Sequence, residues 1–166
     1  MENLVREIVK DVNDLAVFLD NVYNINCGGC CFFASCIARY LEELNIPYSV
    51  AFYDSSINND DAVEIYQNIK NRNDLGTPNG YSTCNHYTLK VDDVVLNSLD
   101  HLDDDYVVVD DISCEDLDWI YENGSWNSSY DTKYNVAIED YINNLFKKYE
   151  EDKKRKESNI IGFEVY

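Results

Sequence analysis

The sequence predicts an α+β fold in which N-terminal helices pack on a small antiparallel β-sheet. Apolar residues recur with helical spacing in the first part of the chain, and short strand-like runs follow them. Hydrophobic residues make up 45% of the 166 residues, which is enough for a core that forms without a partner chain. No repeat or linker divides the chain, so we expect residues 1–166 to form a single domain.

Two amphipathic helices are predicted at the start of the chain. The first covers residues 2–22, where one face is apolar and consists of Leu4, Ile8, Val12, Leu15, Leu19 and Val22. A loop with two glycines follows. The second helix is predicted from Cys30 to Leu44, shortly before Pro47.

A strand and a third helix are expected next. Residues 48–53 (YSVAFY) are mostly β-branched or aromatic and predict a strand. The carboxylates of Asp60 and Asp61 suit a helix N-terminus, and residues 62–71 continue that helix. Glycines and a proline predict a loop at residues 73–83.

The runs at residues 86–91 and 94–99 predict a β-hairpin, because only the dipeptide Asp92–Asp93 separates them. A two-residue turn there pairs Val91 with Val94. Four further elements are expected after the hairpin: a strand at 106–109, a short helix at 113–122, a long helix at 133–157 and a final strand at 160–166.

The chain is strongly acidic, with a formal net charge of −19. Phosphate groups repel such a surface, so we expect neither a nucleic-acid partner nor binding to an anionic membrane. Two interpretations of the charge stay open. It serves solubility, or it forms a surface that meets a basic partner or mimics nucleic acid. The sequence predicts no oligomeric state.

No membrane-spanning or secretory segment is predicted. No stretch approaches the roughly 20 apolar residues of a membrane span, and the N-terminus is too charged for a signal peptide. We therefore expect a cytoplasmic protein with reduced thiols at Cys27, Cys30, Cys31, Cys36, Cys84 and Cys114. Cys36 and Cys114 are interpreted as small buried apolar residues.

Cys30 has the sequence context of a nucleophile. A thiol attacks as thiolate, and a helix N-terminus lowers the pKa of a thiol because its N–H groups favour negative charge. Cys30 opens the second helix directly after Gly28 and Gly29, which allow a tight bend and leave room for a substrate. A nearby imidazolium would lower the pKa further.

His86 is the candidate base. It begins a predicted strand, whereas His101 lies in an acidic loop where a solvated side chain is expected. The hairpin register places Leu99 opposite His86 and makes Asn97 its diagonal neighbour on the same face. We therefore expect Asn97 to orient His86, with Asp100 as the alternative, because a one-residue slip would reverse the choice.

An oxyanion hole needs donors close to the nucleophile. The backbone N–H of Cys30 is one expected donor. A side-chain amide shortly before the motif is expected to supply another, from Asn24 or Asn26, with Asn24 preferred.

The segment of residues 27–35 (CGGCCFFAS) resembles the nucleophile motif of papain-like cysteine peptidases. Cys30 stands at the nucleophile position, Cys27 at the cysteine three residues earlier and Phe33 at the aromatic position. Asn24 falls where papain-like enzymes place a glutamine that lines the oxyanion hole.

A second segment carries the rest of the resemblance. Asn85–His86 looks like the motif around the histidine of papain-like enzymes, and Leu96–Asn97–Ser98 like the segment that holds their asparagine. The first segment is also similar to a transglutaminase-like motif, whose third residue is often aspartate, which keeps Asp100 open. The resemblance implies a papain-like cysteine peptidase, amidase or acyltransferase. Such an enzyme cleaves a peptide or amide bond of a peptide or protein substrate through Cys30, His86, Asn97 and a thioester, without a metal or cofactor.

Three other interpretations remain. Cys27 and Cys30 form a CxxC pair that looks like a thioredoxin-type redox motif, although a helix and loop rather than a strand precede it. The same pair with Cys84 and His86 could hold zinc. A non-enzymatic protein that acts through its acidic surface is the third.

Overall fold

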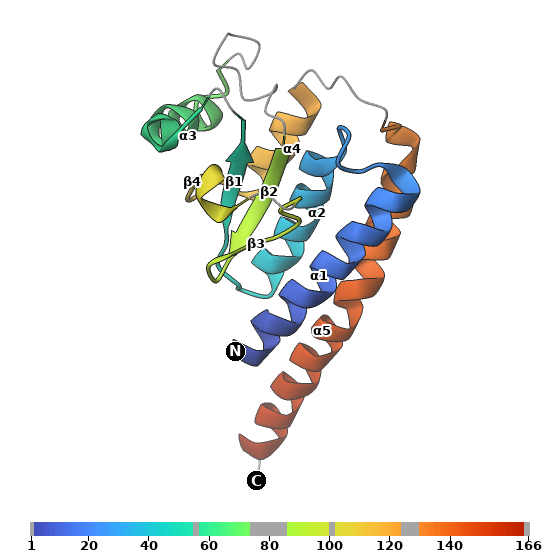
Figure 1. Ribbon diagram of the computed structural model, residues 1–166. Coiled ribbons are helices and arrows are strands. Elements are labelled where there is room, and N and C mark those ends of the chain that lie inside the picture. Colours follow the sequence, from blue (N-terminus) through green and yellow to red (C-terminus); the bar gives the residue numbers. More distant parts are fainter. Residues whose placement is uncertain (1, 55–56, 74–85, 100–101, 124–129, 165–166) are drawn as a thin grey trace.

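The computed structural model describes residues 2–54, 57–73, 86–99, 102–123 and 130–164, and within them it confirms the α+β class (Figure 1). Its helices are α1 (Glu2–Tyr23), α2 (Cys30–Glu43), α3 (Ala62–Lys70), α4 (Cys114–Asn123) and α5 (Asn135–Glu164). Its strands are β1 (Ser49–Tyr53), β2 (His86–Val91), β3 (Val94–Val95) and β4 (Val107–Val109). Single turns of 3₁₀ helix lie at η1 (Asn59–Asp61), η3 (Asp103–Asp105) and η4 (Thr132–Tyr134).

The strands form one antiparallel sheet in the order β3-β2-β1-β4. The hairpin register is confirmed, because Val91 pairs with Val94. Between them Asp92 and Asp93 have φ values of 47° and 67°, as a type I′ turn requires. On the other side of β2, His86 pairs with Tyr53 of β1.

The second hairpin strand is shorter than predicted, and the expectation of a strand over 94–99 is wrong beyond Val95. Asn97 and Leu99 have φ values of 51° and 57°, which lie in the left-handed region. A strand cannot continue through that conformation. The chain therefore leaves the sheet after two residues, which leaves the start of β2 uncovered by β3.

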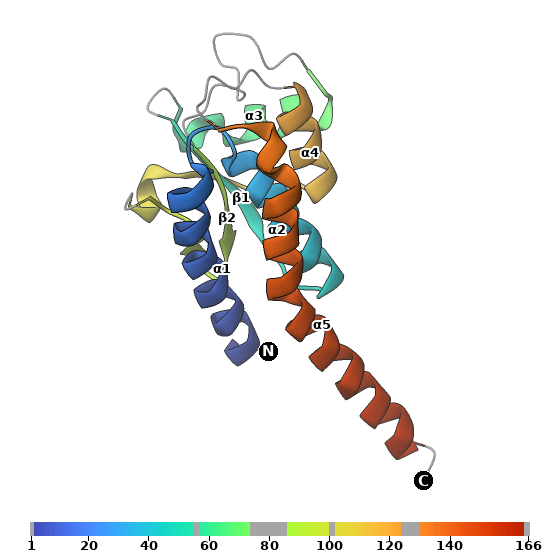
Figure 2. The same cartoon turned by 90° about the vertical axis from the view of Figure 1, so that its right-hand side faces the viewer.

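Helix α2 is the central element of the fold, because it packs against β2, α4 and α5 (Figures 1 and 2). Large apolar side chains cover the sheet face that contributes to this main core: Val50, Phe52, Tyr87, Leu89, Val91, Val107 and Val109. The other face carries a smaller buried cluster of Ala51, Val95 and Tyr106. His86 is the first residue of β2, and its side chain lies on this second face because side chains alternate along a strand. This end of β2 lies next to the start of α2.

The C-terminal strand predicted at residues 160–166 is wrong over its described part, because α5 runs through Glu164. The preceding charged residues favour helix, and no proline interrupts them. Figure 2 shows the end of α5 projecting past the body of the molecule. None of the described strands pairs with this segment, and the helix continues through Glu164.

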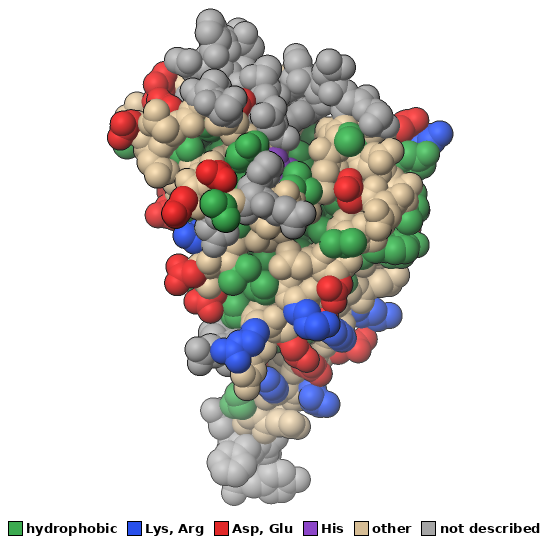
Figure 3. All heavy atoms as spheres, viewed as in Figure 1, with side chains coloured by type: hydrophobic (Ala, Val, Ile, Leu, Met, Phe, Trp, Pro, Cys, Tyr) green, Lys and Arg blue, Asp and Glu red, His purple; other side chains and the backbone are tan. Residues whose placement is uncertain are grey.

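Charge is distributed unevenly over the surface. Figure 3 shows Lys and Arg side chains gathered at the lower end of the molecule, while Asp and Glu side chains are spread more widely. Ten residues of α5 carry six of the 13 basic residues, namely Lys147, Lys148, Lys153, Lys154, Arg155 and Lys156. Of the helices that the structure describes, none combines the length and the apolar character needed to cross a membrane.

Candidate active site

The loop between α1 and α2 delivers Cys30 to the first position of α2, as predicted. Asn24 ends α1 in the left-handed conformation, with a φ of 57°, and donates its N–H to the Asp20 carbonyl at 2.9 Å. Gly28 has a φ of 119°, a conformation that favours glycine. The predicted tight bend is therefore present immediately before Gly29 and Cys30.

Gly29 has a different role from the one expected. Its φ is −100°, so any residue could adopt its backbone conformation. The ring of Tyr130 packs against it, and a Cβ at this position would come within 3.0 Å of three ring carbons. The space that glycine leaves is thus filled by Tyr130 rather than held open for a substrate. Tyr130 also hydrogen-bonds Asn135 through its hydroxyl, which fixes the ring.

Gly29→Ala should therefore destabilise the fold. Overpacking a well-filled site costs about 1–3 kcal/mol, and the anchored ring has little freedom to move. Urea unfolding should show a lower midpoint with an unchanged slope. Cys27→Ala, at an exposed position of the same loop, should stay within about 0.5 kcal/mol of the parent. Equal midpoints for the two variants would contradict the packing role of Gly29.

Burial dominates the electrostatics of the Cys30 thiol. The side chain is only 3% exposed, and burial raises the pKa of Cys30 to about 11. Hydrogen bonds from the backbone N–H groups of Tyr87, Cys31 and Cys30 itself lower the pKa, but by less. The backbone N–H groups at the start of α2 therefore lower the pKa of Cys30 as expected, but burial raises it by more. The resting side chain is consequently a neutral thiol.

The N–H of Tyr87 reaches Cys30 because β3 is short. Leu89 accepts the Leu96 N–H at 2.8 Å on the β3 side of β2. Residues two apart on a strand direct their backbone groups to the same side, so Tyr87 points its N–H past the end of β3. The Cys30 sulfur lies there. His86 directly precedes Tyr87, so the nucleophile and base predicted from distant segments lie at the same end of β2.

His86 is held by a backbone carbonyl. Its ring is 1% exposed, and Nε2 lies 2.7 Å from the carbonyl oxygen of Asn97. A carbonyl only accepts, so Nε2 carries the proton. In the neutral ring the lone pair, and with it the basic function, then lies on the buried Nδ1. Tyr106 lies edge-on to the imidazole, with ring centroids 6.3 Å apart.

Asn97 meets His86 through its main chain, while its side chain is directed elsewhere. The Asn97 amide donates to Asn26 Oδ1 at 2.8 Å and accepts from Asn26 Nδ2 at 3.3 Å. The Asn97 N–H donates to Asn13 Oδ1 of α1 at 2.8 Å. The residue predicted to orient His86 is therefore in contact with it, but by a carbonyl rather than by the side-chain amide that was expected.

The remaining predicted site residues are less connected. Asn24 is exposed and serves α1 as its C-terminal cap, whereas Asn26, the second choice for the oxyanion hole, contacts Asn97. Asp100, His101 and Cys84 lie outside the described residues. Sequence reasoning missed Asn13, since no local pattern announces a contact between residues 84 positions apart.

The five cysteines that the structure describes are thiols and form no disulfide. Cys36 and Cys114 are buried, as predicted. Among the described residues no group of three or more Cys, His, Asp or Glu side chains could hold a metal ion, and the zinc site left open as an alternative also involves the undescribed Cys84. Helix α1 and a loop precede Cys27, which differs from the strand that normally leads into a thioredoxin-type motif.

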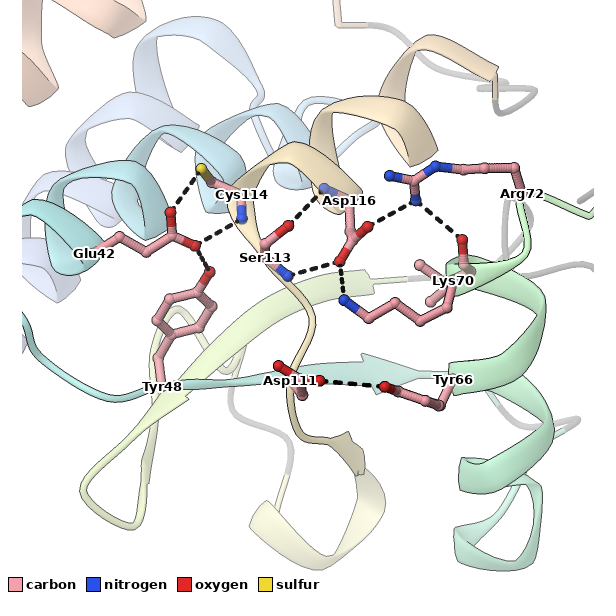
Figure 4. Close-up of polar contacts among 10 residues, drawn as sticks. Glu42, Tyr48, Tyr66, Lys70, Arg72, Asp111, Ser113, Cys114 and Asp116 are labelled. Atoms are coloured by element: carbon pink, nitrogen blue, oxygen red, sulfur yellow. Dashed lines mark hydrogen bonds and ion pairs between the residues drawn. The ribbon is translucent and has the colours of Figure 1, made fainter.

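A separate polar cluster surrounds the N-terminus of α4 (Figure 4). The Glu42 carboxylate accepts the Cys114 N–H at 3.0 Å, the Cys114 thiol at 3.0 Å and the Tyr48 hydroxyl at 2.7 Å. Burial and this carboxylate raise the pKa of Cys114 to about 12. Cys114 is therefore a neutral thiol at neutral pH, and the cluster joins α2, the residue before β1 and α4 as a structural contact.

Asp116 forms the second half of this cluster. Its carboxylate accepts the Ser113 N–H at 2.9 Å, and Ser113 Oγ accepts the Asp116 N–H at 3.1 Å, which makes a capping box. Lys70 and Arg72 pair with it at 2.7 and 2.8 Å. Burial alone would raise the pKa of Asp116, but these contacts outweigh burial and lower it. The pairs attach α3 to α4.

At the start of β2 the structure thus brings the Cys30 sulfur to the backbone beside His86 and the His86 ring to the Asn97 carbonyl. The polar cluster of Figure 4 pairs its thiol with a carboxylate and contains no imidazole. No protein-family model, curated protein or solved structure matches this chain.

Proposed function

We propose that this protein is a thiol hydrolase of the papain/transglutaminase-like kind that acts on a peptide or amide bond. One observation carries the proposal. The Cys30 sulfur accepts the N–H of the residue that follows His86, and the Asn97 carbonyl holds His86 in the tautomer with a basic Nδ1. Nucleophile, base and orienting group are the three parts that a thiol hydrolase needs.

The proposed reaction has two halves. The Cys30 sulfur attacks the substrate carbonyl carbon while the thiol proton moves to His86 Nδ1. The C–N bond then breaks as Nδ1 returns that proton to the departing amine, which leaves a thioester on Cys30. In the second half, water attacks the thioester and gives a proton to Nδ1. The thiolate leaves as the carboxylic acid forms and takes that proton back.

The backbone N–H of Cys30 is the proposed donor to the oxyanion. As the first residue of α2, it has no helical carbonyl to bind and in the resting protein contacts its own sulfur, so in the proposed reaction the N–H would turn to the oxyanion instead. The helix dipole adds a positive field at this position. Asn24 remains the second donor that the sequence suggests, although it is exposed at the end of α1.

A neutral resting thiol gives this mechanism a specific form. With a pKa of about 11, only about 10⁻⁴ of Cys30 would be thiolate at pH 7 in the absence of a base. His86 must therefore remove the proton during attack rather than maintain a thiolate–imidazolium pair beforehand. The role of His86 is consequently visible in the pH dependence of the reaction of Cys30.

The test is alkylation of the native protein with iodoacetamide, followed by mass spectrometry of each cysteine. Cys30 should be modified faster than Cys36 and Cys114 at pH 7. Its rate should rise with pH less steeply than that of an unassisted thiol, because His86 takes the thiol proton during attack. In His86→Ala the rate at pH 7 should fall at least tenfold and rise about tenfold per pH unit, as an unassisted thiol does.

The exposed Cys27 serves as the internal standard, since its labelling should be the same in both proteins. Two results would contradict the proposal. One is labelling of Cys30 no faster than Cys36 or Cys114, which would mean that reagents do not reach the sulfur. The other is an identical pH profile in the parent and His86→Ala.

A further inference from the structure

Asn97 is in a conformation that its sequence neighbours do not impose. Its φ of 51° lies in the left-handed region, where asparagine is more acceptable than most residues. The direction of its carbonyl depends on this backbone conformation. Because that carbonyl accepts the Nε2 proton of His86, whatever fixes the backbone of Asn97 also fixes the imidazole.

Two side chains from other elements hold Asn97 in place. Asn13 of α1 accepts the Asn97 N–H at 2.8 Å, and this bond acts directly on the peptide unit. Asn26 forms the pair of amide hydrogen bonds with the Asn97 side chain. Asn26 is itself anchored, because its N–H donates to Asp20 Oδ1 at 3.0 Å. The contacts run from α1 and the α1–α2 loop to a segment 71 to 84 residues away.

These residues line a cavity of about 330 Å³, and five of its eight lining residues are Asn or Asp, namely Asn13, Asp20, Asn21, Asn26 and Asn97. Asn21 shares the wall and the helix with Asn13 but is exposed and takes no part in the hydrogen bonds to Asn97. It therefore offers a matched control for Asn13.

We propose that Asn13 and Asn26 are positioning residues, which clamp Asn97 so that its backbone carbonyl keeps the proton of His86 on Nε2. The inference rests on the proposed function, because it assigns a purpose to the basic Nδ1. Without the clamp the Asn97 peptide can rotate, and Nε2 loses its acceptor. The proton then distributes over both ring nitrogens, and a ring that is protonated on Nδ1 cannot accept the thiol proton.

The experiment compares Asn13→Leu, Asn13→Asp and Asn21→Leu in the full chain. Leucine has nearly the shape of asparagine but accepts no hydrogen bond, whereas aspartate keeps the acceptor. The first readout is the tautomer of His86 from its imidazole ¹⁵N shifts, at a pH where the ring is neutral. The second is the rate of Cys30 alkylation at pH 7.

Asn13→Leu should populate the Nδ1–H tautomer and label Cys30 at least tenfold more slowly. Asn13→Asp and Asn21→Leu should both retain the Nε2–H tautomer and the parental rate. Asn26→Leu should shift the tautomer in the same direction as Asn13→Leu, because it removes both amide bonds. Circular dichroism and urea midpoints identify any variant that fails to fold, and Asn13→Asp then decides whether the acceptor matters.

An unchanged tautomer in folded Asn13→Leu would overturn the positioning role, as would an Asn13→Asp protein that behaves like Asn13→Leu. Either result leaves the proposed function intact, since that depends on the labelling of Cys30 in the parent protein. Conversely, a parent protein in which Cys30 resists labelling refutes the hydrolase proposal, and the ¹⁵N shifts still report whether Asn13 controls His86.

Discussion

Cys30→Ala should abolish acyl transfer to the protein. With an activated ester such as p-nitrophenyl acetate, the parent should release a burst of nitrophenol and carry an acetyl group on Cys30. The variant should show no burst and no adduct, and its turnover should fall on the order of 10³-fold or more, because the covalent route is lost. Mass spectrometry of the quenched protein and stopped-flow absorbance measure the two effects.

Cys36→Ala is the control for this experiment. Cys36 lies two turns further along α2 and is also buried, and burial raises the pKa of its thiol to about 12. It should retain the full burst even though it loses some packing. An acetyl group found equally on Cys30 and Cys36, or a burst that survives in Cys30→Ala, would assign the reactivity to a different residue.

The largest effect on stability is expected for Asp116→Asn. The Asp116 carboxylate is 5% exposed and pairs with both Lys70 and Arg72, so its loss leaves two cations without their partner (Figure 4). Breaking a buried pair costs about 3–5 kcal/mol, and the partial exposure of both cations reduces this to about 2–3 kcal/mol. Urea unfolding at pH 7 measures the loss.

The exposed pair of Arg155 and Asp152 on α5 supplies the control, because its atoms are 3.2 Å apart and both side chains are more than half exposed. Asp152→Asn should change the free energy of unfolding by less than about 0.5 kcal/mol. A similarly small loss for Asp116→Asn would show that the ion pairs around α4 contribute little to the free energy of unfolding.

The loss of stability in Asp116→Asn should depend on pH. The folded-state pKa of Asp116 is lowered, so its charge stabilises the fold above the unfolded-state pKa of about 3.9 and ceases to do so as the pH falls through the folded-state value. The difference in unfolding free energy between the parent and Asp116→Asn should therefore be constant from pH 5 to 8 and shrink below about pH 4. A difference that grows on acidification would contradict the direction of this shift.

Most of the fold could be predicted because its signals are local. The spacing of apolar residues defined α1 and α2, and the dipeptide Asp92–Asp93 defined the hairpin register. The two wrong strands failed for different reasons. Residues 94–99 and 160–166 are rich enough in apolar residues to pair, but a strand also needs a partner edge and a compatible backbone. The former turns away at Asn97, whereas the described part of the latter continues α5 and pairs with no described strand.

The candidate site could also be predicted from the sequence only in part. The position of Cys30 at the start of a helix was predictable, since Gly28, Gly29 and the apolar spacing after them lie within a few residues. The raised pKa of its thiol was not, because burial depends on chain segments that close over the sulfur from far along the sequence. Helix dipoles act within one turn, whereas desolvation depends on the whole surroundings of a group.

The sequence by itself determined the α+β class and the order of most elements, and it supplied the candidates for a nucleophile and a base. Only the tertiary structure decided that Cys30 meets the backbone beside His86, and that a carbonyl held by Asn13 orients the imidazole in place of a side-chain amide. The physical reason is the range of the forces involved. Backbone preferences and periodicity act between near neighbours, while hydrogen bonds between distant segments exist only after the core has brought those segments together.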